Sequence, residues 1–237
     1  MEYNEVIRNV STNQKEIIMN IINMHNNGNP FDVDITYSTG GFYKKKNSKD
    51  IEVPEPILKF DVFPQLEDVV KIEPWGSLPL EDESVLSIMF DPPFVCGPRT
   101  DKPIKDGSCI ISKRFSSYYP MYELHESYHH WINEAYRILK DGGIFVVKCQ
   151  NTISSSRFYA NEEYTWLEAE KAGFTTLDKF NLNAKSRLLS GQIKEQQHAR
   201  NYNSVFWVFQ KDKKKKVDYY LWEHDEKAIA KMKEIKG

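Results

Sequence analysis

The chain has 237 residues, of which 40% are hydrophobic and 13% aromatic, enough for the core of one large domain or two small ones. Its formal net charge of −2 gives no overall attraction to phosphate, so any surface that contacts nucleic acid must be local. The three cysteines, Cys96, Cys109 and Cys149, lack metal-type spacing and fit reduced thiols in the cytoplasm. We expect neither a signal peptide nor a membrane span, because no apolar run is long enough.

The N-terminal part begins with a helix and a short strand. Residues 11–26 predict the helix, because S-x-x-Q beginning at Ser11 fits a capping box and isoleucines follow at helical spacing. Residues 31–43 predict a short strand that runs into a turn of small residues. Gly40 and Gly41 in this turn permit a backbone that approaches a ligand closely, although an ordinary Gly-Gly turn would have the same sequence.

Two further short strands are expected before the middle of the chain. Residues 44–57 are too polar, and too interrupted by proline, to form a helix. Residues 57–63 predict a strand with Asp61 near its end, where an exposed carboxylate would be the simpler interpretation. Residues 69–73 predict the next strand, and Trp75 follows it either as a core residue or as a ligand contact.

The most informative stretch lies at residues 85–94. Residues 85–90 are an apolar run that predicts a strand buried on both faces, the kind found inside a parallel sheet. Asp91, Pro92, Pro93 and Phe94 follow, and two prolines cannot continue a sheet ladder. A carboxylate and an aromatic ring therefore stand at the carboxyl end of a central strand, where open α/β sheets bind ligands. A plain strand-to-loop turn is the alternative.

A basic loop and a histidine-bearing helix come next. Residues 95–117 predict a long loop that either acts as a lid and contacts nucleic acid or is an ordinary surface loop. Residues 121–139 predict an amphipathic helix. His125 and His129 are one turn apart on it, but the pattern supplies no third ligand. We therefore expect exposed or hydrogen-bonded histidines, His130 included, and no metal site.

The C-terminal half continues the alternation of helices and strands. The expected elements are a helix cap at Gly142, a buried strand at 144–147, a helix at 161–172, a strand from 173, a polar basic loop at 182–203 and a buried strand at 204–210. The last two strands join without a helix. We therefore predict an α/β fold with a seven-stranded, mostly parallel sheet and one antiparallel strand near the edge. Residues 1–210 would form this domain and residues 211–237 a basic, helical extension.

Several motifs resemble those of one enzyme family. D-P-P-F at 91–94 resembles the D-P-P-Y/F motif of S-adenosylmethionine-dependent amino-methyltransferases, which act on exocyclic amines of nucleic-acid bases. Residues 34–41 resemble a weakened form of the family's D-P-F-x-G-S-G motif, and residues 78–84 resemble its L-P-x-x-D-x-S segment. Residues 198–209 resemble the closing hairpin of small phage- and prophage-type DNA methylases. The resemblance covers roughly residues 11–210 and implies a Rossmann-like class I methyltransferase fold with S-adenosyl-L-methionine as cofactor.

The resemblance also implies roles for individual residues. Asp91 and the carbonyl of Pro92 would accept hydrogen bonds from the amine, and Phe94 would stack on a flipped base. Adenine N6 of DNA is favoured, because family members that act on cytosine N4 more often carry Ser where Asp91 stands. The implied cofactor contacts are Asp34, Thr36, Ser38, Gly40, Asp61, Glu73 and Trp75. The implied nucleic-acid contacts are Arg99, Arg114, Lys185, Arg187, His198 and Arg200.

Two other interpretations stay open. The first is an RNA base amino-methyltransferase, because the D-P-P-F/Y motif is shared with enzymes that act on RNA. A catalytically silent nucleic-acid-binding module or methyltransferase subunit is the other, favoured by the weakened glycine motif and by the lack of a helix after it. We expect a monomer or homodimer, and a partner protein for target recognition is a further alternative, because the chain has no large separate recognition domain.

Overall fold

The computed structural model describes residues 6–45, 47–94, 121–154, 156–185, 198–199 and 201–213. Within these residues, eight strands form one sheet in the order β1-β9-β10-β6-β5-β2-β3-β4. The strands are β1 (Val10–Ser11), β2 (Val33–Asp34), β3 (Leu58–Asp61), β4 (Val70–Lys71), β5 (Val85–Phe90), β6 (Leu139–Cys149), β9 (Phe174–Asn183) and β10 (Asn203–Lys211).

The direction of the strands confirms the predicted fold class. All neighbouring strands run parallel, except that β10 is antiparallel to both β6 and β9. This is the mostly parallel sheet with one antiparallel strand that the class I methyltransferase fold requires. The prediction of seven strands was wrong by one, because Val10 and Ser11 pair with Asn181 and Leu182 on the free edge of β9. Such a two-residue strand has no periodicity that a sequence could reveal.

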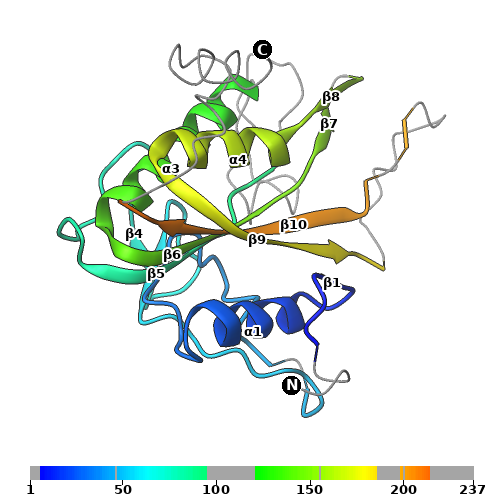
Figure 1. The fold of residues 1–237 in the computed structure, drawn as a ribbon, viewed down its shortest axis with the longest axis horizontal. Helices are drawn as coiled ribbons and strands as arrows, with labels where there is room; N and C mark the ends of the chain where they lie inside the picture. The colour runs from blue at the N-terminus through cyan, green and yellow to red at the C-terminus, as the bar shows by residue number, and fades with distance from the viewer. Residues whose placement is uncertain are drawn as a thin grey trace, which may run out of the picture.

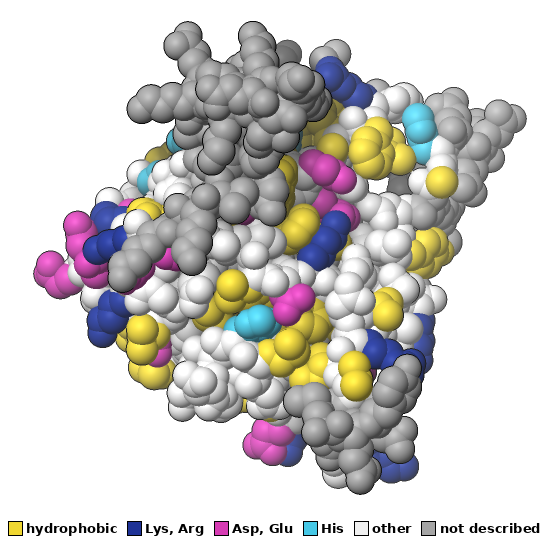
Figure 2. Space-filling view, in the orientation of Figure 1, with side chains coloured by type: hydrophobic (Ala, Val, Ile, Leu, Met, Phe, Trp, Pro, Cys, Tyr) yellow, Lys and Arg dark blue, Asp and Glu magenta, His cyan; other side chains and the backbone are white. Residues whose placement is uncertain are grey.

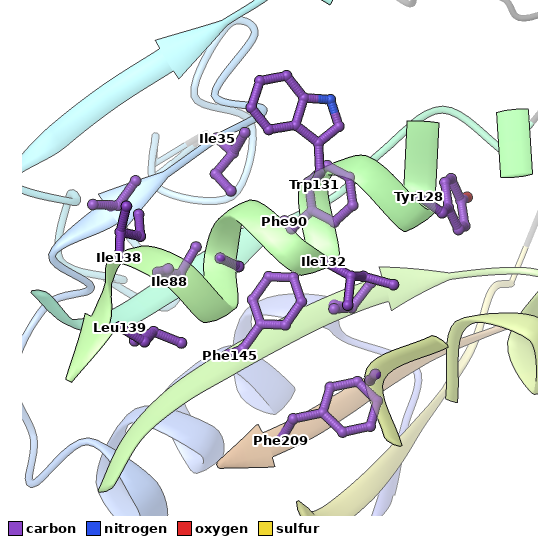
Figure 3. Packing of buried hydrophobic residues seen from close by; sticks show 14 of the residues in the cluster. Ile35, Ile88, Phe90, Tyr128, Trp131, Ile132, Ile138, Leu139, Phe145 and Phe209 are labelled. Atoms are coloured by element: carbon purple, nitrogen blue, oxygen red, sulfur yellow. The ribbon is translucent and has the colours of Figure 1, made fainter. Parts of the chain in front are cut away.

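Three helices of the described residues cover the two faces of the sheet. Helix α1 (Gln14–His25) lies on one face, and helices α3 (Met121–Ile138) and α4 (Asn161–Ala172) lie on the other (Figure 1). Each face has its own buried cluster. Figure 3 shows the larger one, in which Phe90 and Phe145 pack beneath α3 and Phe209 lies farther from it, on β10. Strands β7 (Thr152–Ser154) and β8 (Arg157–Tyr159) form a separate hairpin that projects beyond the sheet.

The predicted helices are present with small shifts. Helix α1 begins after Asn13, whose side chain accepts a hydrogen bond from the amide of Lys15, so the predicted capping box at Ser11 was wrong. Instead the Ser11 hydroxyl accepts the Asn13 amide and donates to Glu16. Helix α4 has the predicted bounds and ends at Gly173, where a positive φ of 105° permits the left-handed cap.

Two sequence predictions around β5 and β6 need correction. Leu86 was expected to be buried but is 52% exposed, because the pairing of β5 with β6 is interrupted between Val85 and Ser87. Ser87 is buried instead, and its hydroxyl accepts the amide of Asp32. Gly142 was expected to cap α3, but it lies inside β6, four residues beyond the end of the helix.

The segment that was expected not to be helical is indeed irregular in its described part. Lys15, which is 4% exposed, anchors this segment to α1. Its ammonium donates to the carbonyl of Lys44 and to a carboxylate oxygen of Asp50, at 2.7 and 2.8 Å. A loop held by a buried lysine thus takes the place of a helix. Among the described helices, none has the length and apolarity that a membrane span needs.

Candidate active site at the carboxyl edge of the sheet

A cleft of about 260 Å³ opens at the carboxyl ends of neighbouring parallel strands. Residues at or near the carboxyl ends of β2, β3, β5 and β6 line it, together with Gln14 of α1 and two residues of α3. The lining is Gln14, Ile35, Thr36, Tyr37, Ser38, Thr39, Gly41, Phe42, Asp61, Val62, Phe90, Asp91, Pro92, Pro93, Ser127, Trp131 and Lys148. The cleft therefore lies where an open α/β sheet binds its ligands.

Asp91 stands at the centre of this edge. Its amide donates to the Thr36 hydroxyl at 2.6 Å, which fixes the backbone where β5 ends. Its Oδ2 lies 3.4 Å from the Lys148 ammonium. Its Oδ1 is buried and accepts no hydrogen bond from any described residue. Burial raises the pKa of Asp91, and the Lys148 charge opposes that shift. The site therefore holds a carboxylate oxygen that lacks a donor.

Asp34, at the end of β2, is buried beside Asp91. Its carboxylate accepts the Thr36 amide at 2.8 Å and the Tyr43 hydroxyl at 2.6 Å. Burial is the largest influence and raises the pKa of Asp34 to about 7, with Asp91 and Asp61 adding repulsion. Both oxygens of Asp34 are occupied, so this residue mainly fixes the backbone around Thr36 and adds negative charge.

Asp61 ends β3 and orders the turn on the other side of the cleft. Its two oxygens accept the amides of Ser38 and Phe63, at 2.8 and 2.7 Å. Burial raises the pKa of Asp61, and these two amides oppose the shift. Since a carboxylate has about four lone-pair positions, Asp61 retains capacity to accept hydrogen bonds from a ligand.

The glycine turn is built tightly around Tyr37. Gly40 has a φ of +69°, and a Cβ at this position would lie 2.5 Å from the Tyr37 hydroxyl oxygen. The Tyr37 ring in turn stacks on the Tyr43 ring, with 5.5 Å between the centroids. Gly40 is thus needed for both its backbone angle and its small size. Gly41 has open space beside it.

The structure brings most of the predicted cofactor residues together, but not all. Thr36, Ser38 and Asp61 line the cleft, and Asp34 and Gly40 support its wall. Glu73 is paired with Lys71, and Trp75 is 51% exposed against His130. Neither is part of the cleft lining.

The predicted catalytic residues lie together, whereas the predicted nucleic-acid contacts are dispersed. Asp91 and Pro92 line the cleft, and the Phe94 ring lies 5.9 Å from the Lys148 ammonium. Lys185 lines a neighbouring surface cleft, and His198 lines a groove beside the β7–β8 hairpin. The other four predicted contacts lie outside the described residues, namely Arg99, Arg114, Arg187 and Arg200. On the visible face in Figure 2, described basic side chains are scattered among acidic ones.

The histidines of α3 are hydrogen-bonded, as predicted. His125 contacts the Asn161 side chain, His129 the Glu168 carboxylate and His130 the Gly76 carbonyl. No cluster of potential metal ligands occurs in the part of the chain that the structure describes.

Sequence reasoning missed Lys148. It lies near the carboxyl end of β6, in a run of apolar residues, with its side chain 11% exposed. The signal was present, because a lysine that interrupts a buried strand near its carboxyl end requires a partner. Lys148 faces a site that contains three carboxylates, those of Asp34, Asp61 and Asp91. The cleft thus fits a ligand that carries positive charge and hydroxyl groups.

Comparisons with known proteins find only distant structural similarity. No family model and no curated protein matches the sequence. A Thermus thermophilus protein assigned as a DNA modification methylase, solved with S-adenosyl-L-methionine, is 14% identical, with a TM-score of 0.39 over 61% of this chain and 55% of that chain. PvuII DNA methyltransferase, which is cytosine-N4-specific, is 16% identical, with a TM-score of 0.40 over 56% of this chain and 44% of that chain.

A third similar structure is that of a cyclase. The (4+2)-cyclase SpnF is 12% identical, with a TM-score of 0.47 over 84% of this chain and 80% of that chain. This chain spans about half the length of the two methylases it matches. The activity must therefore be argued from the residues of the site.

Proposed function

We propose that this chain is an S-adenosylmethionine-dependent methyltransferase that acts on an exocyclic amine of a nucleic-acid base, with adenine N6 of DNA as the favoured target. The observation that carries the proposal is Asp91 Oδ1, a buried acceptor that no described residue satisfies, in a cleft at the carboxyl edge. A buried acceptor without a donor is unfavourable, and a base amine would supply the donor.

The cofactor would occupy the side of the cleft formed by the glycine turn. S-adenosylmethionine supplies an electrophilic methyl group on a positively charged sulfur, and it carries an ammonium group and ribose hydroxyls. The carboxylate of Asp61 would accept hydrogen bonds from the hydroxyls. The negative charge of Asp61 and Asp91 would favour a cationic ligand, and Asp34, whose pKa is raised to about 7, would add to it as the pH rises. The tight turn at Gly40 would keep the backbone close to it.

The chain's own residues would then activate and orient the amine. An exocyclic base amine is a poor nucleophile, because its lone pair is delocalised into the ring. Asp91 Oδ1 and the Pro92 carbonyl would accept its two N–H groups and direct the lone pair toward the methyl group. Methylation of the amine would release one proton, and the Asp91 carboxylate would be able to accept it. Phe94 would stack on the base.

The preference for adenine rests on the identity of residue 91. Aspartate stands where members of the resembled family that act on cytosine N4 more often carry serine. Cys149 has no part in the scheme, because burial raises the pKa of its thiol well above the ordinary value. Direct transfer needs no covalent intermediate with the protein.

The proposal is tested by methyl transfer from isotopically labelled S-adenosylmethionine to duplex DNA, single-stranded DNA and RNA. Nucleoside mass spectrometry of the products identifies the methylated base. We expect labelled N6-methyldeoxyadenosine. Label on RNA alone would assign the activity to RNA bases, and label on deoxycytidine would refute the preference for adenine. No label on any substrate would contradict the proposed function.

A further inference from the structure

Lys148 is held in one place by four groups from three segments of the chain. Its ammonium lies 3.4 Å from Asp91 Oδ2. It also lies 5.0 Å from the centroid of the Phe42 ring, 5.8 Å from that of Phe206 and 5.9 Å from that of Phe94. These three rings and one carboxylate leave the side chain only 11% exposed. A buried ammonium in this setting is stable only with a paired charge, and Asp91 supplies it.

The register of the sheet explains why these two residues meet. Phe90 on β5 pairs with Val147 on β6, so the next residue of each strand, Asp91 and Lys148, lies at the same level of the sheet edge. Within the described residues, Asp91 is the single carboxylate paired with Lys148. Asp34 and Asp61 are held instead by backbone amides and by Tyr43.

We propose that Lys148 is a positioning residue, which holds the Asp91 carboxylate through Oδ2 and leaves Oδ1 as the acceptor for the base amine. This inference rests on the proposed function. The ion pair at Oδ2 fixes the plane of the Asp91 carboxylate, so Oδ1 keeps one orientation toward the base amine. The same ion pair keeps Asp91 ionised. A protonated carboxyl group would carry an O–H donor, and it would then oppose an N–H donor of the amine.

The groups around Asp91 explain why the Lys148 charge is needed to keep Asp91 ionised. Asp91 is buried, and the nearby Asp34 and Asp61 carboxylates and the Tyr43 hydroxyl offer no positive charge. An opposite charge within about 4–6 Å typically lowers a carboxyl pKa by about 1–3 units. Removal of the Lys148 charge should therefore raise the pKa of Asp91. The acid limb of the profile of methyl-transfer rate against pH should then shift to higher pH.

The experiment compares the wild-type protein with Lys148→Met, Lys148→Gln and Lys148→Arg. Single-turnover methyl transfer is measured from pH 5.5 to 9, and cofactor affinity is measured by calorimetry. On the acid limb, Lys148→Met and Lys148→Gln should lose about tenfold or more in rate, since each pKa unit is a factor of ten. Cofactor affinity should change less than about threefold, and Lys148→Arg, which keeps the charge, should recover most of the rate.

Lys179→Met is the matched control. Lys179 is also a partly buried lysine of the sheet, on β9, with its ammonium 4.6 Å from the Trp207 ring centroid and paired with Glu162. Its loss should leave the pH profile unchanged. A shift of equal size in Lys179→Met would mean that the effect is not specific to Lys148 and would overturn the proposal.

A second readout does not depend on activity. The Asp91 carboxyl carbon is followed by ¹³C NMR during a pH titration, and its signal is assigned from its loss in Asp91→Asn. The proposal expects the Asp91 titration to move to higher pH in Lys148→Met but not in Lys179→Met. Identical titration in the wild type and Lys148→Met would overturn it. If the wild type transfers no methyl, the proposed function fails, while the NMR result still decides whether Lys148 controls Asp91.

Discussion

Three glycine substitutions separate the two constraints on the turn at Gly40. Gly41→Ala meets open space at an ordinary φ, Gly28→Ala meets open space at a φ of +76°, and Gly40→Ala meets both a φ of +69° and the Tyr37 hydroxyl at 2.5 Å. A left-handed conformation costs a non-glycine residue about 1–2 kcal/mol. Displacement of a packed side chain costs about 1–3 kcal/mol more. The free energy of unfolding should therefore fall by about 2–5 kcal/mol in Gly40→Ala.

Thermal unfolding checks this order. A loss of 1 kcal/mol lowers Tm by about 2–4 °C in a domain of this size, so Gly28→Ala should lose about 2–8 °C and Gly40→Ala about 4–20 °C. Gly41→Ala should stay within about 0.5 kcal/mol of the wild type. Because Tyr37 lines the cleft, Gly40→Ala should also weaken cofactor binding, unlike Gly28→Ala. Equal losses in Gly28→Ala and Gly40→Ala would refute the argument that Tyr37 confines Gly40.

The remaining predictions concern Asp61 and Asp34. Asp61→Ala should weaken S-adenosylmethionine binding in calorimetry by about 10–100-fold, because hydrogen bonds to charged groups contribute about 1.5–3 kcal/mol. Replacement of the exposed Asp68 by alanine is the control. An unchanged affinity in Asp61→Ala would argue against Asp61 as a ligand of the cofactor. The folded-state pKa of Asp34 is raised from 3.8 to about 7, so its contribution to stability is greatest below about pH 4 and declines as pH rises toward 7. Urea unfolding at pH 5 and pH 8 should show a wild-type loss of about 2–3 kcal/mol that Asp34→Asn lacks, and equal losses in both proteins would contradict the raised pKa.

Much of the architecture follows from local sequence signals. The strand β5 ends where it was predicted to end, since Pro92 and Pro93 cannot continue the ladder. Helix α4 ends at Gly173 because that residue adopts the left-handed cap. The antiparallel β10 was predicted from the direct connection of the last two strands. In each case the residues that decide the structure lie within the element or directly beside it in the sequence.

Other features depend on partners that are far away in the sequence. Ser87 is buried, and Leu86 exposed, partly because Asn26, at the end of α1, and Asp32, just before β2, donate hydrogen bonds to Ser87. The pairing of Lys148 with Asp91 depends on the register between β5 and β6. The edge strand β1 depends on a free edge of β9. A single sequence contains no local pattern for such contacts.

The structure brings some of the predicted site residues together and leaves others apart. Asp91, Asp61 and the glycine turn were found because they follow strands whose carboxyl ends meet. Glu73 and Trp75 follow β4, the outermost strand of that side, and the cleft does not reach them. Lys148 was overlooked because a lysine inside an apolar run carries no motif.

Asp91→Asn and Asp91→Ala test the central claim most directly. Both variants are compared with the wild type in single-turnover methyl transfer to DNA and in calorimetric binding of S-adenosylmethionine, with Asp68→Asn as the control. Loss of the oriented acceptor should reduce the rate by at least about 10²–10³-fold, while cofactor affinity stays within about threefold. The account predicts this separation of catalysis from binding. Methyl transfer at the wild-type rate in Asp91→Ala would contradict it.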